Sequence, residues 1–312
     1  MSKVSLLTVM IPVFNEQECV GGLYTELAEV LNDLSCECEI LFVNDGSTDD
    51  TLALIKNLQV ADQRISIVDL SRNYGKEVAM AAGLDYLSGD ALVIIDADLQ
   101  DNPAILPVML SEIENGYDDV YAQRISRKGE TWFKKASSLW YYKLLGAMST
   151  VPIQRNTGDF RMLSQKAIVA LRNLKENERN MKGLFSFIGF KKKAIYYERA
   201  ERFAGKTKWN YFQLLNLAVR GITAFSTKPL RMISVSGIII SMISFIFLAK
   251  IIFKALFYGD PVAGYPSLMS TVLFLGGIQL LSIGVLGEYV GIIFSETKKR
   301  PIYFVNDYYT NK

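Results

Sequence analysis

The stretch VIIDADLQ (Val93–Gln100) runs an apolar segment directly into two carboxylates, Asp96 and Asp98. Similar apolar runs recur along the first part of the chain, and amphipathic stretches of helical length separate them. This alternation is typical of parallel strands joined by covering helices, which bury both faces of each strand and leave it uniformly apolar. The sequence therefore predicts an α/β fold with a doubly wound, mostly parallel sheet.

The boundaries of the expected elements follow from the same pattern. The predicted strands are Leu6–Val13, Glu39–Asn44, Ile65–Leu70, Ala91–Ile95 and Asp119–Gln123. The helices predicted between them are Glu16–Leu34, Asp49–Leu58, Lys76–Tyr86 and Pro103–Asn115. Ligands of such sheets bind beyond the carboxyl ends of the strands, so Asp96 and Asp98 fall where we expect chemistry.

Composition limits the chemistry that this chain can perform. Half of the 312 residues are hydrophobic, which is enough for one soluble core and a further apolar part. A net charge of only +2 provides no overall basic field, so we expect no nucleic acid partner. The absence of histidine excludes a Ser-His-Asp triad and histidine metal ligands. Catalysis is left to carboxylates, cations or a metal held by oxygen.

The three cysteines, Cys19, Cys36 and Cys38, form neither a zinc-binding set nor a disulfide framework. An odd number of thiols suits a reducing compartment. We interpret them as thiols that are either buried or unreactive.

The apolar surplus lies near the C-terminus. Tyr211–Phe225 has helical spacing suited to a membrane surface. Met232–Ala249 and Leu268–Gly287 each approach the roughly 20 apolar residues that cross a bilayer. Two buried helices of a soluble domain are the alternative. The short connection GDPVAGYPS between the two segments predicts a transmembrane hairpin.

Charge orients that hairpin. Basic residues flank its entry and its exit, and only Lys250 and Lys254 lie near the turn. By the positive-inside rule, both ends and the large domain then face the cytosol. We predict a cytosolic catalytic domain (1–209), a juxtamembrane amphipathic helix region (210–231), a transmembrane hairpin (232–295) and a cytosolic tail (296–312).

Two other strand ends resemble the first in polarity. The first predicted strand ends in PVFNE (residues 12–16), and the second ends in NDGSTDD (residues 44–50). An acidic pair alone is often a solvated turn, and the turn at Asp45 also has a purely structural interpretation. Three polar ends on one sheet edge favour a site, since Asp-x-Asp offers oxygen ligands to a hard cation, Mg²⁺ or Mn²⁺.

Six motifs together resemble the family 2 glycosyltransferases, in the branch similar to dolichol-phosphate mannose synthase and the bactoprenol glucosyltransferases. In chain order they are PVFNE, NDGSTDDT, SRNYGKEVAMAAGL, DADLQDNP, TGDFRML and RFAGKTKW. With the hairpin, the resemblance covers nearly the whole chain. It implies a Rossmann-like (GT-A) domain that binds a nucleotide-sugar.

The resemblance also assigns roles to residues. It implies that Pro12, Phe14, Glu16 and Asp45 hold the nucleoside. It implies that Asp96, Ala97, Asp98 and Gln100 form the diphosphate and metal motif, with Asp98 as the direct metal ligand and Asp96 as a second one. Many relatives have DDG where this chain has NDG, so Asn44 lacks a charge present in them.

The resemblance implies that two carboxylates are catalytic, Asp98 of the metal motif and Asp159 on the acceptor side. The residues expected to grip the acceptor phosphate are Arg124, Lys135, Ser138, Arg202 and Lys208.

The implied reaction is an inverting transfer of one sugar, glucose from UDP-glucose by resemblance, onto polyprenyl (undecaprenyl) phosphate at the cytosolic face of a bacterial plasma membrane. A polysaccharide-extending synthase and a noncatalytic nucleotide-binding membrane anchor are the alternatives. Glycines of the second apolar segment, among them Gly276 and Gly284, permit close helix packing and hence a homo-oligomer.

Overall fold

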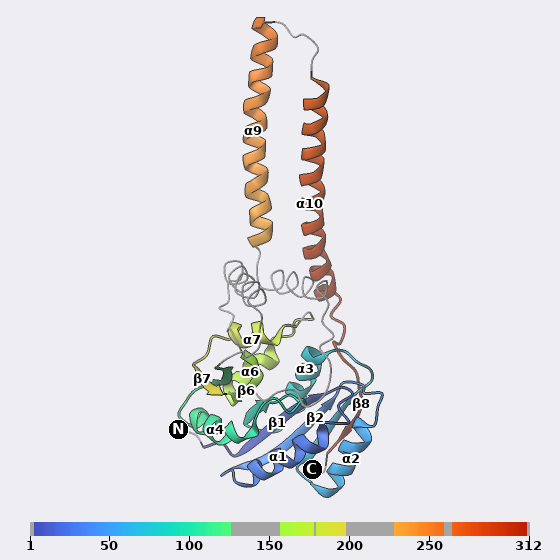
Figure 1. Ribbon diagram of the computed structural model, residues 1–312, viewed down its shortest axis with the longest axis vertical. Coiled ribbons are helices and arrows are strands. Elements are labelled where there is room, and N and C mark those ends of the chain that lie inside the picture. The colour runs from blue at the N-terminus through green and yellow to red at the C-terminus, as the bar shows by residue number, and fades with distance from the viewer. Residues whose placement is uncertain (1–2, 126–156, 178, 198–227, 259–263, 311–312) are drawn as a thin grey trace. The chain divides into compact units, whose positions relative to one another are not determined.

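The computed structural model describes residues 3–125, 157–177, 179–197, 228–258 and 264–310. The chain divides into two compact units. The first holds the sheet, its helices and the C-terminal segment, and the second contains two long helices (Figure 1).

An eight-stranded sheet forms the centre of the first unit, in the order β7-β5-β6-β4-β1-β2-β3-β8. Its strands are β1 (Leu6–Val13), β2 (Glu37–Asn44), β3 (Ile65–Leu70), β4 (Ala91–Ile94), β5 (Asp119–Arg124), β6 (Thr157–Ser164), β7 (Lys192–Tyr197) and β8 (Val305–Tyr309). Strands β1 to β4 run parallel, whereas β6 is antiparallel to β4 and β5, and β8 is antiparallel to β3. The prediction of a mostly parallel α/β sheet is confirmed.

Helices cover both faces of this sheet. The helices are α1 (Val20–Asn32), α2 (Thr51–Ala61), α3 (Lys76–Tyr86), α4 (Leu106–Glu114), α6 (Gln165–Asn173) and α7 (Met181–Phe187), with a 3₁₀ turn η1 at Pro103–Ile105. Alternate strand residues such as Val9 and Ile11 join the core formed with α1, α2 and α4. Met10 faces α3, where a Cβ added to Gly83 would lie 2.6 Å from the Met10 sulfur, so the Met10 side chain packs closely against this glycine.

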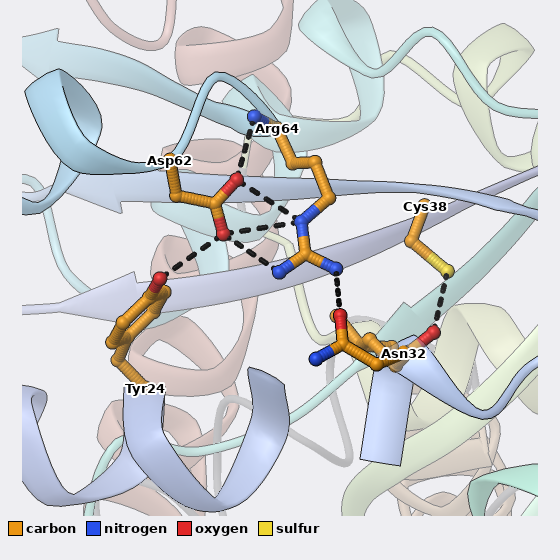
Figure 2. Close-up of polar contacts among 6 residues, drawn as sticks. Tyr24, Asn32, Cys38, Asp62 and Arg64 are labelled. Atoms are coloured by element: carbon orange, nitrogen blue, oxygen red, sulfur yellow. Dashed lines mark hydrogen bonds and ion pairs between the residues drawn. The ribbon is translucent and has the colours of Figure 1, made fainter. Parts of the chain in front are cut away.

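A polar cluster away from the carboxyl ends of the strands ties α1 to the segment before β3 (Figure 2). The Asp62 carboxylate accepts hydrogen bonds from the Arg64 guanidinium, the closest at 2.8 Å, and from the Tyr24 hydroxyl at 3.1 Å. Arg64 also donates to Asn32 at the end of α1, at 2.9 Å. These side chains satisfy one another, so the cluster is structural. Nearby Cys38 is a free thiol, as are Cys19 and Cys36.

The elements expected from apolar periodicity are present, with β1, β3 and α3 at the predicted bounds. The predicted helix Pro103–Asn115 is η1 followed by α4. Sequence reasoning did not predict β6, β7, β8, α6 or α7. Residues 305–309, expected within a tail, instead form the edge strand of the sheet.

The second unit contains α9 (Lys228–Tyr258) and α10 (Tyr265–Thr297). Among residues with described side chains, one helical stretch, Phe274–Thr297, has the length and apolar composition to cross a bilayer, and none of it is buried inside the protein. The apolar stretch Leu230–Ile240 of α9 is shorter. One membrane span, in α10, therefore meets these criteria. The other predicted span, Met232–Ala249 in α9, stays a prediction.

Candidate active site

The carboxyl ends of β1 and β2 are joined by hydrogen bonds between their loops. The Asn15 amide donates to the Ser47 hydroxyl at 3.0 Å, and the Thr48 amide donates to the Asn15 side-chain oxygen at 2.8 Å. Asn15 has a φ of 54°, in the left-handed region that asparagine tolerates. The two polar strand ends expected to lie together therefore do so.

Asp45, directly after β2, holds the segment that leads into α3. Its carboxylate is 2% exposed and accepts hydrogen bonds from the amides of Tyr74, at 2.7 Å, and Gly75, at 2.8 Å. Burial raises the pKa of Asp45, and these two amides offset part of that rise. Asp45 thus fixes the backbone immediately before Lys76.

Two glycines make this loop contact feasible. Gly46 has a φ of +65°, and a Cβ there would lie 2.4 Å from the carbonyl carbon of Arg72. Gly75 has a φ of +96°, a backbone conformation that residues other than glycine rarely adopt. Glycine at both positions lets the β2 end and the α3 entry pack backbone to backbone.

The loop after β4 carries the DADLQ motif. The Asp98 carboxylate accepts a hydrogen bond from the Gln100 amide at 3.2 Å, and Ala97 is buried. Leu99 between them has a φ of 57°, which indicates a tight turn. Buried Asp101 accepts a hydrogen bond from the Tyr197 hydroxyl at 2.5 Å, which ties this loop to the end of β7.

Lys76, the first residue of α3, links two carboxylates of different strands. Its Nζ lies 2.6 Å from Oδ1 of Asp96, which follows β4. It also lies 2.5 Å from Oδ2 of Asp159 on β6. The other oxygen of Asp159, Oδ1, is buried and has no hydrogen-bond partner in the described part of the chain. A carboxylate with one open oxygen can still bind a ligand.

Electrostatics keep this pair charged. Burial alone would raise the pKa of Asp159, but the nearby charges of Lys76 and Lys182 outweigh burial and lower it. Burial opposes the charge on Lys76, yet Asp96 and Asp159 raise its pKa above the ordinary value. Both groups are therefore ionised at neutral pH.

Neighbouring Glu77 is anchored to α7. Its carboxylate accepts a hydrogen bond from the Met181 amide at 2.6 Å, and burial raises its pKa. The first turn of α3 is thus held on both sides, by Asp45 and by α7.

Arg124, the last residue of β5, lies beside the strand that carries Asp159. A Cβ added to Gly158 would lie 3.4 Å from Nη2 of Arg124. The Nε atom of Arg124 is buried without a hydrogen-bond partner among the described residues. A cation at the Gly158 position with a donor that no described residue uses suits an anionic ligand.

Comparison with known sequences decides the family. Residues 8–172 match the family described as glycosyl transferase family 2. An uncharacterized glycosyltransferase of Synechocystis is 45% identical over 96% of this chain and 95% of its own length. The bactoprenol glucosyl transferase of Shigella phage SfV is 42% identical over 96% of this chain and 98% of its own.

The chain belongs to glycosyltransferase family 2. Within that family it falls in the branch that contains the bactoprenol glucosyl transferases. Among solved structures, glucosyl-3-phosphoglycerate synthase from Mycobacterium tuberculosis, in complex with Mn²⁺, UDP-glucose and phosphoglyceric acid, is 19% identical with a TM-score of 0.47. That alignment covers 70% of this chain and 78% of the other.

The site of this family 2 enzyme brings together part of the predicted set. Asp96 and Asp159 share Lys76, and Asp98 and Gln100 share one loop. Pro12 lies in β1 opposite Val43, Phe14 is 41% exposed, and the Glu16 amide donates to the Thr51 hydroxyl at 2.9 Å. Lys135, Ser138, Arg202 and Lys208 lie outside the described residues, so their roles stay predictions.

A divalent cation would have to rely on few protein ligands here. Across the described residues, no group of three or more acidic, cysteine or histidine side chains is arranged to hold a metal. Asp96 and Asp98 provide carboxylate oxygens from one loop, which fits a hard cation that takes its remaining ligands from water and a diphosphate. The donor set therefore fits Mg²⁺ or Mn²⁺ bound together with substrate.

Lys76 is the site residue that sequence reasoning missed. It lies within the motif SRNYGKEVAMAAGL, which contributed to the family resemblance. A lysine at the first position of a helix opposes the helix dipole, so its presence there was a signal of a local carboxylate partner. Its distance in sequence from Asp96 and Asp159 hid which carboxylates those were.

Proposed function

We propose that this glycosyltransferase moves one glucose from UDP-glucose onto polyprenyl phosphate, undecaprenyl phosphate in bacteria, with inversion at the anomeric carbon. The single observation that carries the proposal is the ion pair of Lys76 with Asp96 and Asp159. It holds the carboxylate of the diphosphate motif and the expected acceptor carboxylate within reach of one ammonium group. The names of relatives at about 42% identity over nearly the whole chain support the lipid acceptor.

The acceptor chemistry suits this site. A phosphate monoester has a second pKa of about 6, so it is largely dianionic at neutral pH and needs no strong base. One of its oxygens forms a bond to the anomeric carbon while the bond from that carbon to the UDP oxygen breaks. Asp159, held charged by Lys76, orients the nucleophile and its cations. Arg124, on the strand paired with β6, supplies further positive charge for the acceptor phosphate.

Asp98 and Asp96 would hold the divalent cation, which when bound neutralises charge on the departing diphosphate. The chain's own residues shape the rest of the donor side. Asp45 keeps the loop before α3 in place, and the exposed face of Phe14 is available to a nucleobase. The ring of Phe14 would stack on the base.

Membrane attachment places the enzyme next to its lipid substrate. We assign Phe274–Thr297 as one span and Met232–Ala249 as the other, with the catalytic domain on the cytosolic side of the bacterial plasma membrane. The apolar side chains of α9 and α10 support this assignment, because residues such as Ile238 and Leu280 are more than half exposed within the protein.

A panel assay tests the proposal. The full-length protein in detergent is given Mn²⁺, undecaprenyl phosphate and, one at a time, radiolabelled nucleotide-sugars. We expect label from UDP-glucose to enter the organic phase as one sugar per lipid, and none to do so without the lipid. Label that stays in the aqueous phase with every donor would contradict the proposal.

Product size separates the polysaccharide synthase alternative, because that enzyme would build a growing chain. A noncatalytic membrane anchor would bind nucleotide and transfer nothing. Either result would replace the proposed reaction with the corresponding alternative.

A further inference from the structure

The position of Lys76 has a physical cost that its surroundings offset. A cation in the first turn of a helix faces the positive end of the helix dipole, which disfavours it. Two carboxylates within 2.6 Å compensate. Asp45, through Gly75, and Glu77, through Met181, hold the backbone on either side of Lys76. These contacts therefore hold the Lys76 ammonium between Asp96 and Asp159.

Lys76 is a single ammonium shared between two carboxylates, Asp96 and Asp159, at one sheet edge. The charges of Lys182 and Arg161 also act on Asp159 and, like Lys76, lower its pKa. Lys76 is 40% exposed at its side chain and Asp96 is 25% exposed, so neither is locked in a closed interior. The contact of Lys76 with Asp96 can therefore be exchanged for another cation.

We propose that Lys76 is the resident counter-ion of this edge: it neutralises Asp96 and Asp159 before substrates arrive, and a divalent cation displaces it from Asp96 and leaves it on Asp159. This inference rests on the proposed function, because it takes Asp96 and Asp98 as the cation's ligands. Lys76 is then a positioning residue. It competes with the metal on Asp96 and holds Oδ2 of Asp159, whose Oδ1 has no hydrogen-bond partner among the described residues.

Competition between Lys76 and the metal predicts the direction in which metal affinity changes when Lys76 is replaced, and a purely structural lysine would cause no such change. Two cations close to one carboxylate repel each other, so removing the ammonium must tighten metal binding. Lys76→Met should bind Mn²⁺ about tenfold more tightly than the unaltered protein. Lys76→Arg keeps the charge and should bind Mn²⁺ with nearly unaltered affinity.

The measurement is Mn²⁺ binding to the full-length protein in detergent without lipid, first without nucleotide and then with UDP. Binding is followed by the electron paramagnetic resonance signal of free Mn²⁺, corrected for the Mn²⁺ that UDP binds without protein. Lys166→Met is the matched control. Lys166 also lies in the first turn of a helix, α6, and pairs with an aspartate, Asp118, at 3.8 Å. The control should leave Mn²⁺ affinity unchanged. If Lys76→Met does not fold, Lys76→Gln provides the same test with a hydrogen-bonding side chain.

The outcomes separate this inference from the proposed function. If the unaltered protein binds Mn²⁺ and neither Lys76→Met nor Lys76→Gln binds it more tightly, the counter-ion role is wrong and the metal site stands. If the unaltered protein binds no Mn²⁺ either alone or with UDP, the metal assignment fails and the counter-ion role fails with it. Tighter Mn²⁺ binding by Lys76→Met or Lys76→Gln, with the affinity of Lys76→Arg unchanged, supports the proposal.

Discussion

Two buried carboxylates at opposite ends of the parallel strands differ in how their oxygens are used. Glu39, near the amino end of β2, accepts hydrogen bonds from Thr8 at 2.7 Å, from Ser66 at 3.3 Å, and from the Ser88 amide and hydroxyl at 3.0 and 3.1 Å. Asp159, on β6, pairs with one ammonium and keeps one oxygen without a partner among the described residues.

The difference separates structural from functional burial. Glu39 is satisfied by hydroxyl and amide donors that the fold provides, so its charge holds strands together and is complete without a ligand. Asp159 retains hydrogen-bonding capacity that nothing in the described chain uses, which is the expected state of a group that binds substrate. The two ends of one sheet thus divide stability and chemistry between them.

The largest expected effect is a loss of activity from changes at the carboxyl ends of the strands, where the candidate active site lies. Asp98→Asn removes a carboxylate charge from the diphosphate motif, so kcat for sugar transfer should fall roughly 100- to 1,000-fold. The unfolding temperature should stay near that of the unaltered protein, because Asp98 is only half-buried. Asp33→Asn, at an exposed aspartate after α1, is the control and should transfer at the normal rate. Normal transfer by Asp98→Asn would remove this motif from the mechanism.

A change at Glu39, near the amino ends of the strands, should lower stability instead of activity. Glu39→Ala leaves the hydroxyls of Thr8 and Ser66 and the Ser88 amide without their acceptor, which should lower the free energy of unfolding by about 3 kcal/mol. The measurement is thermal unfolding, with kcat determined at a temperature where the variant is folded. Loss of kcat without loss of stability would reverse the proposed division of the sheet.

A smaller effect should reach the donor side from the C-terminal strand. Asn306 on β8 donates to Asp69 at 3.2 Å, and Asp69 in turn accepts from Asn44 at 2.6 Å, the residue before Asp45. Asn306→Ala should raise KM for the nucleotide-sugar about fivefold and leave KM for the lipid unchanged, since one hydrogen bond contributes about 1 kcal/mol.

Asn32→Ala is the matched control for that variant. It removes a side-chain amide from the Arg64 cluster, away from the carboxyl ends of the strands (Figure 2). It should leave both KM values unchanged. Equal changes in the two KM values of Asn306→Ala would mean that β8 supports the whole domain rather than the donor loop.

The smallest effect concerns pH. The pKa of Asp159 is lowered in the folded protein, so its pairing with Lys76 stabilises the fold above the unfolded-state pKa of about 3.9. This contribution is lost as pH falls through the lowered folded value. The stability advantage over Asp159→Asn should therefore be constant from pH 7 to pH 5 and shrink in stronger acid. An advantage that already shrinks between pH 7 and pH 5 would contradict the lowered pKa.

Much of the sheet could be predicted because its signals are local. Apolar runs bounded by polar turns determine β1 and β3, and α3 follows from its periodicity. Strand β8 had no such signal, since its pairing with β3 depends on a return of the chain from residue 305 to residue 70. Antiparallel β6 was recognised only as a motif, because its neighbours are set by topology.

The candidate site was predictable in part for the same reason. Resemblance named Asp96 and Asp159 singly, but the ammonium between them belongs to a third segment, and no pattern within one segment shows such a contact. The hydrogen bonds of Asp45 to the loop before Lys76 were also invisible to sequence, because they use backbone amides.

The central claim is that the open carboxylate of Asp159 acts in sugar transfer. Its most direct test is kcat of Asp159→Asn in the lipid-linked transfer assay, measured beside UDP binding by the same preparation. We predict that kcat falls by at least about 100-fold while the affinity for UDP stays within about twofold of normal. Transfer at the normal rate by a variant that binds UDP normally would contradict the account.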